Sequence, residues 1–422
     1  MVQKMRKMKD SGIEWIGEIP EGWEVGQIGQ LYSERRTKVS DKNYPPLSVT
    51  MKGILPQLST AAKTDAHDDR KLVCKGDFAI NSRSDRRGSC GISEQDGSIS
   101  LINTVLQPRG EMNPGYYNWL FHTSMFADEF YKWGHGIVDD LWTTGWSDMK
   151  KIGVPIPSKC EQKQLAEHLN FECSHIDSIL SKTRASIEEY KKLKQSVITQ
   201  AVTKGVRGKR EMKDSGVEWI GEIPVDWEIS RIKYVSIFEP SCDFRKLTPE
   251  TIITYSPMEC IKNGTFERRT SLYGNLAHTL TPFQNGDIVM AKVTPCFENG
   301  NIAIMNELQS GYGLGSSELF VFRPQNINTR YLFYWLQNKL FVHQACATMT
   351  GTGGLKRISP SFVKNCNIHY PSTAEQAQIA AYLDTKCAEI DKLIAKKEQL
   401  VKELDSYKKS LIYEVVTGKR EV

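Results

Sequence analysis

The sequence predicts an α+β protein built by tandem duplication, in which a mixed α/β globular half is followed by one long α-helix, twice over. Two duplications lead to this fold class. A string of 17 residues at 8–24 returns at 212–228 with three positions changed, and a segment of helical periodicity at 161–203 returns at 375–417. The stretches before the helical segments alternate short apolar runs with turn residues, as short strands do. A repeat this long indicates duplication of a whole unit rather than a solenoid.

Composition is that of an ordinary globular protein, with 40% hydrophobic and 25% charged residues in a chain of 422. The ten cysteines form no C-x-x-C pair, so neither a zinc site nor a disulfide framework is expected. No apolar run approaches the roughly 20 residues of a membrane span, and the beginning of the chain lacks the apolar core of a signal peptide. We therefore expect a cytoplasmic protein with no membrane contact. The net charge of +5 suits an acidic partner without requiring one.

The duplicated string, called the tag below, is apolar at Trp15, Ile16, Ile19 and Trp23, and Pro20 sets a turn within it. This pattern predicts a packed connection that seats a globular half on its neighbour. Direct contact of the tag with DNA is the alternative.

The first globular half, 25–157, carries turn signals such as Lys75-Gly76-Asp77 between short apolar runs, which predicts many short strands. Within it, Tyr116–Tyr131 is predicted to form one helix. The second half, 225–371, repeats these landmarks, with its helix at Tyr331–Leu340. Elsewhere the halves hardly match. Different targets would explain that divergence; loop drift on a common fold is the alternative.

Ser158 precedes Glu161 by three residues, which predicts a capping box at the start of a helix of about 65 Å. Its apolar positions recur near heptad spacing, and each returns 214 residues later, although Lys194 and Lys408 interrupt the two series at the same point. One apolar stripe needs a partner, and the matching helix is the obvious one. The positions predicted for packing between helices or against a partner are Ile176, Leu180, Ile187, Tyr190, Val197, Ile390, Ile394, Val401, Leu404 and Leu411.

Catalytic motifs are missing: there is no P-loop, no H-E-x-x-H and no nucleophile elbow. Asn113-Pro114-Gly115-Tyr116 resembles the Asn-Pro-Pro-Tyr signature of amino-methyltransferases, but no cofactor-binding glycine motif precedes it. The second half has Asn328-Thr329-Arg330-Tyr331 at that position. A turn before a helix is the simpler interpretation, so no catalytic residue and no metal site is predicted.

Basic residues gather at a few points of the globular halves, after a predicted strand in the first half and near glycine turns in the second. Arginine and lysine on loops can contact phosphates or read base edges. A solvated, salt-paired surface is the alternative. The candidates for DNA binding are Arg83, Ser84, Arg86, Arg87, Arg268, Arg269, Lys292, Lys356 and Arg357.

The tags at Asp10–Gly17 and Asp214–Gly221, and the Pro-x-x-x-Glu-Gln helix starts at Pro157–Gln162 and Pro371–Gln376, resemble those of the specificity subunits of type I restriction-modification systems. The resemblance covers nearly the whole chain, although the recognition halves match only in outline.

This resemblance implies that each half is a target-recognition domain that reads one part of a split, asymmetric double-stranded DNA sequence. The two helices would pack as an antiparallel coiled coil, space the domains and dock two methyltransferase subunits, and restriction (motor) subunits would join them. S-adenosylmethionine, ATP and Mg would belong to those partners, and this chain would bind no cofactor. The expected segments are 1–157, 158–210, 211–371 and 372–422, that is, tag plus recognition domain and then helix, twice.

Two other functions are compatible with parts of the sequence. A single-chain DNA methyltransferase would need a cofactor pocket, which no motif indicates. A coiled-coil scaffold without sequence reading would bind partners through its helices while its globular halves ignored DNA sequence.

Overall fold

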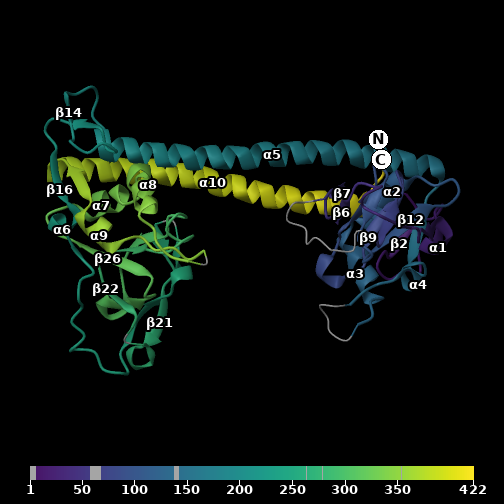
Figure 1. Ribbon diagram of the computed structural model, residues 1–422, viewed down its shortest axis with the longest axis horizontal. Helices are drawn as coiled ribbons and strands as arrows, with labels where there is room; N and C mark the ends of the chain where they lie inside the picture. Colours follow the sequence, from purple (N-terminus) through teal and green to yellow (C-terminus); the bar gives the residue numbers. More distant parts are fainter. Residues whose placement is uncertain (1–5, 58–67, 137–141, 263, 278, 353) are drawn as a thin grey trace. The chain divides into compact units, whose positions relative to one another are not determined.

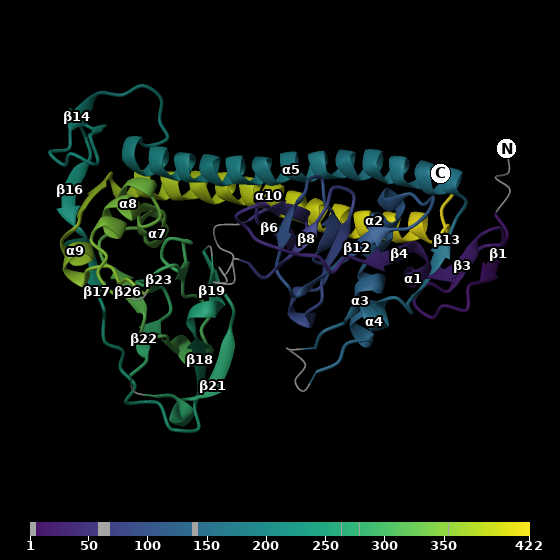
Figure 2. The same ribbon diagram turned by 45° about the vertical axis from the view of Figure 1, so that its right-hand side comes forward.

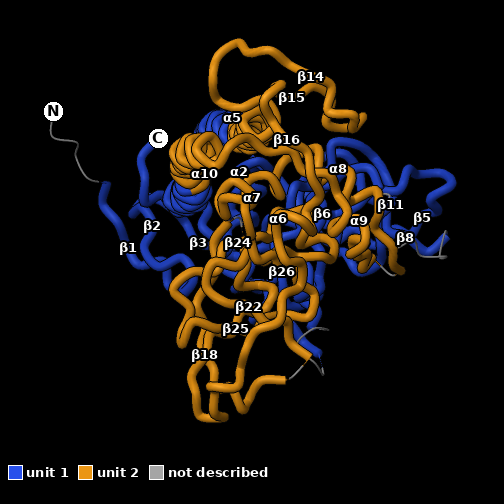
Figure 3. The backbone as a smooth tube through the Cα atoms, turned by 90° about the vertical axis from the view of Figure 1, so that its left-hand side faces the viewer, with its two compact units in different colours: residues 1–184, 399–422 blue, residues 185–398 orange. Residues whose placement is uncertain are grey.

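The protein divides into two compact units in the computed structural model (Figures 1 and 3). Unit 1 comprises residues 1–184 and 399–422, and unit 2 comprises 185–398. Each unit therefore contains one tag, one globular half, and parts of both long helices. The described residues are 6–57, 68–136, 142–262, 264–277, 279–352 and 354–422.

In unit 1 the central sheet is antiparallel, with strand order β10-β9-β12-β4. A second sheet has the order β11-β8-β5, and β6 pairs with β7. The tag forms the hairpin β1–β2, and β3 pairs with the exit strand β13. The bounds are β1 Met8–Asp10, β2 Glu18–Pro20, β3 Glu24–Gln27, β4 Tyr32–Glu34, β5 Lys38–Val39, β6 Leu47–Thr50, β7 Gly53–Pro56, β8 Arg70–Val73, β9 Phe78–Asn81, β10 Cys90–Ile92, β11 Gly97–Ile99, β12 Asn103–Pro108 and β13 Gly153–Ile156.

The helices of this half are short, and they pack on the central sheet through an aromatic core. Their bounds are α1 Ile28–Leu31, η1 Ser84–Arg86, α2 Pro114–Phe121, α3 Ser124–Lys132 and α4 Trp146–Met149. The single helix expected at Tyr116–Tyr131 is wrong. The chain breaks at Thr123, whose hydroxyl accepts a hydrogen bond from the Phe126 backbone N–H and so caps a new helix.

Unit 2 repeats the central sheet in the corresponding order, β24-β23-β26-β17. Its second sheet differs, because it has four strands, β21-β18-β25-β22, of which β18 and β25 run parallel. The bounds are β14 Met212–Asp214, β15 Glu222–Pro224, β16 Glu228–Arg231, β17 Ser236–Phe238, β18 Ile252–Ser256, β19 Ile261–Lys262, β20 Thr265–Phe266, β21 Arg269–Leu272, β22 Thr281–Gln284, β23 Ile288–Ala291, β24 Ile302–Ile304, β25 Tyr312–Gly315, β26 Leu319–Pro324 and β27 Asn367–Tyr370.

Unit 2 also has two short helices where one was expected at Tyr331–Leu340. Asn338 follows the first of these helices and caps the second, because its side chain accepts a hydrogen bond from the Phe341 N–H. The bounds are α6 Ile232–Val235, η3 Met258–Cys260, η4 Tyr273–Asn275, η5 Gln309–Gly311, α7 Thr329–Trp335, α8 Lys339–Ala347 and α9 Pro360–Asn365.

The long helices are α5, Lys159–Lys204, and α10, Thr373–Val416 (Figure 2). Within unit 1 the beginning of α5 packs against the end of α10, and within unit 2 the end of α5 packs against the beginning of α10. The helices therefore pair antiparallel in each unit. The capping box at Ser158 and Glu161 is confirmed by reciprocal hydrogen bonds.

The two lysines that interrupt the apolar series make ion pairs across the helix pair. Lys408 Nζ lies 2.6 Å from Asp177, and Lys194 Nζ lies 2.7 Å from Asp391. Asp391 is the counterpart of Asp177, so the same pair occurs once in each unit. Pairs this exposed contribute little stability, on the order of 0.5 kcal/mol, but they match the register of the helices.

The predicted packing positions are buried to different degrees. In unit 1, Ile176, Leu180 and Leu411 lie in the main core, and half-buried Val401 and Leu404 pack against it. In unit 2 the remaining positions are either buried, as for Ile187 and Ile390, or half-buried, as for Tyr190, Val197 and Ile394.

A glutamine in the first turn of each long helix fastens that helix to the globular half. In unit 1, Gln162 Oε1 accepts the backbone N–H of Asn113 at 2.8 Å, and its Nε2 donates to the Pro157 carbonyl at 2.9 Å. Gln376 makes the same two bonds in unit 2, at 2.7 and 2.9 Å. Both glutamines are buried. The equivalent partners in unit 2 are Asn328 and Pro371.

The asparagine held by that glutamine caps a short helix, and the tyrosine three residues later reaches the other long helix. Tyr116 donates its hydroxyl to the Val416 carbonyl at 2.7 Å, and the Tyr331 hydroxyl lies 2.9 Å from the His369 carbonyl and 3.2 Å from the Val202 carbonyl. The Val416 and Val202 carbonyls belong to the last turns of α10 and α5, where no intrahelical partner exists. The Asn113 side chain accepts from the N–H groups of the first helical turn, which confirms a turn before a helix.

Each long helix ends on a glycine that leaves room for the tag. Gly418 has φ +71°, and a Cβ there would lie 2.9 Å from the Trp23 ring. Gly205 has φ +77°, and a Cβ there would lie 3.0 Å from Arg210, 3.1 Å from Glu375 and 3.4 Å from the Trp227 ring. Both tryptophans are buried. Left-handed backbone without a side chain therefore ends the helix and seats the tag.

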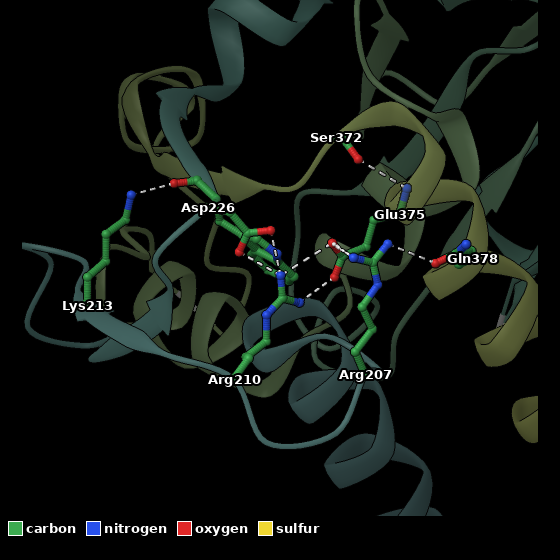
Figure 4. A network of polar contacts seen from close by, with 8 residues as sticks. Arg207, Arg210, Lys213, Asp226, Ser372, Glu375 and Gln378 are labelled. Atoms are coloured by element: carbon green, nitrogen blue, oxygen red, sulfur yellow. Dashed lines mark hydrogen bonds and ion pairs between the residues drawn. The ribbon is translucent and has the colours of Figure 1, made fainter.

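An arginine before each tag completes the contact. In unit 2, Arg210 Nη1 donates to Glu375 at 2.5 Å, and Arg207 lies 3.7 Å from the same buried carboxylate (Figure 4). In unit 1, Arg6 donates to Glu161, the counterpart of Glu375. We call the whole arrangement the helix-end junction: the glutamine, the tyrosine, the glycine, the tag tryptophan and the glutamate–arginine pair.

Replacing Gln376 with Ala tests the junction of unit 2. The change leaves a buried N–H and a buried carbonyl without partners, so we expect unit 2 to lose about 2 kcal/mol of unfolding free energy. Hydrogen exchange at the peptides around Asn328 and Pro371 should rise, while the unit 1 peptides keep their protection. Gln378→Ala, half a turn further along α10, is the matched control, because its exposed side chain accepts only a 3.3 Å hydrogen bond from the exposed Arg207. Equal exchange in the two variants would contradict the role of Gln376.

Candidate nucleic-acid interface

The basic candidates of the first half lie where β9 ends. The segment 82–87 follows that strand, and a second segment, 142–144, lies against it through a bridge between Arg83 and Thr143. Ser84 N–H donates to the Trp142 carbonyl at 2.9 Å. Four of the sequence candidates, Arg83, Ser84, Arg86 and Arg87, are therefore brought together on one surface, called recognition surface 1.

The second half has a surface at the corresponding place, called recognition surface 2. The segment Lys292–Thr294 continues β23, and the segment Thr350–Arg357 lies against it through a bridge between Val293 and Arg357. It brings together Lys292, Lys356 and Arg357, which are far apart in the sequence. Gly353 of the glycine loop lies outside the described residues.

Arg268 and Arg269 are not part of recognition surface 2. Arg269 begins β21 of the second sheet, so the expectation that it lies on a loop is wrong. Its guanidinium lies 3.0 Å from Glu267 and 3.2 Å from Glu259, and Arg268 pairs with Glu307. Neighbouring carboxylates hold both arginines.

The central strands beneath the two recognition surfaces end in residues of different chemistry. We call the four paired residues at these strand ends the floor of each surface. In unit 1 the register pairs Asn81 with Asn103 and Ile80 with Thr104 at the end of the central strands. In unit 2 the same register pairs Ala291 with Leu319 and Met290 with Phe320.

The polar residues of the first floor are buried and partly hydrogen-bonded, although the Asn103 Oδ1 has no partner among the described residues. Ser82 and Thr104 share a hydrogen bond of 3.0 Å between their hydroxyls, and the Tyr131 hydroxyl donates to the Asn81 carbonyl. All the apolar residues of the other floor are buried. Sequence reasoning missed this difference, because it appears only once strand register is known.

Charge pairing also differs from what the basic clusters suggest. Arg83 lies 3.2 Å from Asp85, and Arg87 lies 2.8 Å from Asp128 with its guanidinium over the Tyr131 ring. Recognition surface 1 is therefore a salt-paired surface, as the alternative interpretation of these clusters held. Arg86 is the most exposed of its arginines, 3.7 Å from Asp85.

A buried aspartate directly precedes β9 in unit 1 and β23 in unit 2, and each is paired with an arginine. Asp77 accepts two hydrogen bonds from Arg35, and Asp287 accepts two from Arg323. Arg35 follows β4, whereas Arg323 lies within β26, so the two halves supply the same cation from different strands. The hydrogen bonds that Arg323 donates to Asp287 raise the pKa of Arg323 against the lowering effect of burial. The Gly-Asp landmarks could have indicated the acid, but nothing in the sequence indicated its partner.

A buried histidine distinguishes the junction of unit 2. The His369 Nε2 donates to the Val202 carbonyl at 2.8 Å, and its ring stacks on Trp227 and meets the edge of Trp335. Burial lowers the pKa of His369 to about 4, so the ring is neutral at pH 7. The matching residue of unit 1 is Pro155.

In the described part of the chain, no group of three or more His, Cys, Asp and Glu side chains is placed to hold a metal ion. Across the same residues, no helix combines the length and apolar character of a membrane span.

Comparison with known proteins finds relatives of this chain. A family model described as "Type I restriction modification DNA specificity domain" matches residues 224–403. The specificity subunit of the type I restriction enzyme MjaVIII from Methanocaldococcus jannaschii is 24% identical over 428 residues, which cover 96% of this chain and 94% of that protein. Residues 224–403 belong to the type I restriction-modification specificity family. Members of this family are non-catalytic components of their complexes.

Two Escherichia coli specificity subunits match more strongly but over less length. That of EcoEI is 32% identical and that of EcoAI 34% identical, each over 163 residues and 37% of this chain. The match spans about a quarter, 27%, of the length of each of these two relatives.

Two solved structures share the specificity-subunit fold. A chain from a study of complex assembly and conformational transition of the type I system has a TM-score of 0.71 at 12% identity, covering 94% of this chain and 98% of that one. The specificity subunit of Thermoanaerobacter tengcongensis has a TM-score of 0.50 at 15% identity, covering 95% and 98%. At these identities the likeness shows the fold: two β-rich halves, each followed by a long helix, with the helices packed together.

His369 should make unit 2 sensitive to acid. The unfolded chain takes up a proton on this histidine near pH 6.5, whereas the folded chain resists it until about pH 4. Stability contributed by the neutral ring is thus complete above pH 6.5 and falls as the pH drops toward 4, by about 3 kcal/mol in all.

Urea titrations of the full chain at pH 7, 5.5 and 4.5 test this prediction. His369→Met should flatten the pH dependence relative to the wild type, whereas His343→Asn, an exposed control on α8, should not. The same acid sensitivity in wild type and His369→Met would contradict it.

Proposed function

We propose that this chain is the DNA-reading subunit of a cytoplasmic type I restriction-modification complex. Its two halves bind the two parts of an asymmetric, bipartite target in double-stranded DNA. Its helix pair docks two methyltransferase subunits, and restriction subunits join that assembly. S-adenosylmethionine, ATP and Mg act in those partners. The segments 1–157, 158–210, 211–371 and 372–422 are proposed as the functional divisions.

One observation supports this function above the others. The two halves share the central sheet and the helix-end junction, but their recognition surfaces stand on a polar floor in one half and an apolar floor in the other. A scaffold without sequence reading would have no use for that difference. Two unlike surfaces attached in the same way suit two unlike half-sites on one DNA molecule.

Linking two such surfaces in one chain raises the apparent affinity for DNA, because binding of the second becomes intramolecular. The family match over 224–403 supports a DNA-directed role for the second half most directly. The similar structure comes from a study of complex assembly in the type I system, which supports the docking role.

Co-expression with a type I methyltransferase subunit of the same host, followed by single-molecule sequencing of the DNA for methylated adenine, tests the proposal. We expect one split, asymmetric motif. Exchanging residues 25–157 for those of another family member should then alter one part of the motif and leave the other unchanged.

A stable complex that methylates nothing, or that methylates without a split motif, would contradict the proposal and favour a scaffold. Binding of S-adenosylmethionine by the purified chain alone would instead favour a single-chain methyltransferase.

A further inference from the structure

We propose that Lys292 and Lys356 are the phosphate anchors of recognition surface 2, and that Arg357 with Glu318 is the positioning pair that holds them in place. This inference rests on the proposed function. It names residues of this chain that the family match does not assign.

The two segments of recognition surface 2 form a short antiparallel ladder. Thr294 N–H donates to the Lys356 carbonyl at 2.9 Å, and Ile358 N–H donates to the Lys292 carbonyl at 2.9 Å. Thr294 is therefore directly opposite Lys356, and their side chains share a face. Because alternate residues of a strand also share a face, Lys292 lies on the face of Thr294 and Lys356.

The Thr294 hydroxyl fixes the tip of this ladder. Its Oγ1 accepts the Lys356 N–H at 2.9 Å and donates to the Gly354 carbonyl at 2.9 Å. The backbone on both sides of the exposed Lys356 side chain is thereby held against the continuation of β23.

Glu318 is bonded to both segments of this ladder, to Arg357 on one and to Lys292 on the other. Its carboxylate accepts Arg357 Nε at 2.9 Å and Nη2 at 2.7 Å, a two-bond pair, while its backbone carbonyl accepts the Lys292 N–H at 3.0 Å. The hydrogen bonds from Arg357 lower the pKa of Glu318, so the carboxylate stays charged near neutral pH. Because the Arg357 Nε and Nη2 groups already donate to Glu318, the strongest two-bond donor set of this arginine is occupied within the protein.

Among the described residues, Lys292 and Lys356 differ from the arginine candidates in their lack of an ion pair with a carboxylate. Within the described ranges, each of Arg83, Arg87 and Arg357 lies within 4 Å of a carboxylate, whereas neither lysine does. The Lys292 ammonium lies 5.5 Å from the centre of the Phe320 ring, within the range of a cation–π contact with the apolar floor. Lys356 is exposed.

An ammonium without a carboxylate partner is a compact charge suited to a phosphate oxygen. The Phe320 ring of the apolar floor lies beside the Lys292 ammonium, and the nearby Glu318 carboxylate, which interacts with that ammonium through space, accepts its hydrogen bonds from Arg357 instead. The observations favour contact with the DNA backbone over base reading, because nothing orients either lysine toward a planar base edge.

Binding of DNA by the full chain, in complex with its methyltransferase subunits, tests the anchors. The probes are a duplex with the motif found by methylation mapping and a duplex with the second half-site scrambled. Lys292→Ala and Lys356→Ala should each weaken binding about 5- to 20-fold and lower the slope of log affinity against log salt by about 1.

Because the contacts are to phosphates, the loss should be the same on both duplexes. Lys364→Ala, an exposed lysine on α9, is the control and should leave affinity and slope unchanged. Unchanged affinity and slope in both anchor variants would overturn the inference, and so would a loss confined to the cognate duplex.

Glu318→Gln separates positioning from simple charge. Removing a negative charge near DNA should strengthen binding if charge alone matters. The positioning role predicts the opposite: Glu318→Gln should weaken binding by about the same factor as Arg357→Ala, and the double variant should be no weaker than either single one. Stronger binding by Glu318→Gln, or additive losses, would refute the positioning pair.

The wild-type complex tells the two failures apart. If it methylates no split motif, the proposed function falls, and this inference falls with it. If it methylates such a motif while the lysine variants bind DNA like wild type, the assignment of the anchors alone is wrong.

Discussion

The constraint on which the rest of this structure depends is the helix-end junction. The last carbonyls of a long helix have no partner within the helix, and a buried helix end must find donors elsewhere. Here a tyrosine of the globular half supplies one to each helix, and a buried glutamine ties the start of the other helix to that half. Each unit thereby holds the end of one helix and the beginning of the other. Removing either glutamine bond would leave polar groups of the helix start unpaired, whereas in unit 2 the Val202 carbonyl would keep its bond from His369.

With the junctions held constant, the globular halves are free to differ. The central sheets keep their strand order, yet the second sheets differ in strand number and direction. The same buried aspartate takes its arginine from β4 in one half and from β26 in the other. The floors beneath the recognition surfaces invert from polar to apolar. These changes lie away from the residues that fasten each half to the helices, so a new recognition surface need not disturb the attachment.

Sequence reasoning went furthest where local chemistry decides structure. The duplicated tag, the capping box at Ser158 and the turn at Asn113 could all be predicted, because each depends on neighbouring residues. The breaks at Thr123 and Asn338 were missed, since a capping side chain inside an apolar run competes with continuing the helix. The Arg35–Asp77 pair and the two floors could not be predicted, because they depend on contacts between distant strands. Among the candidate DNA residues, the sequence identified the clusters but not which charges the protein itself neutralises.

The most direct test of the account replaces the interior of the second half, residues 232–366, with residues 28–152 of the first, which keeps both helices and both tags and puts Asn113 and Tyr116 where Asn328 and Tyr331 make their junction bonds. If the junction only positions a half and the half alone reads DNA, the methylated motif should become one in which the first half-site is read twice. Retention of the original second half-site by a folded, methylating complex would contradict the account, because recognition would then reside in the helices or the tags.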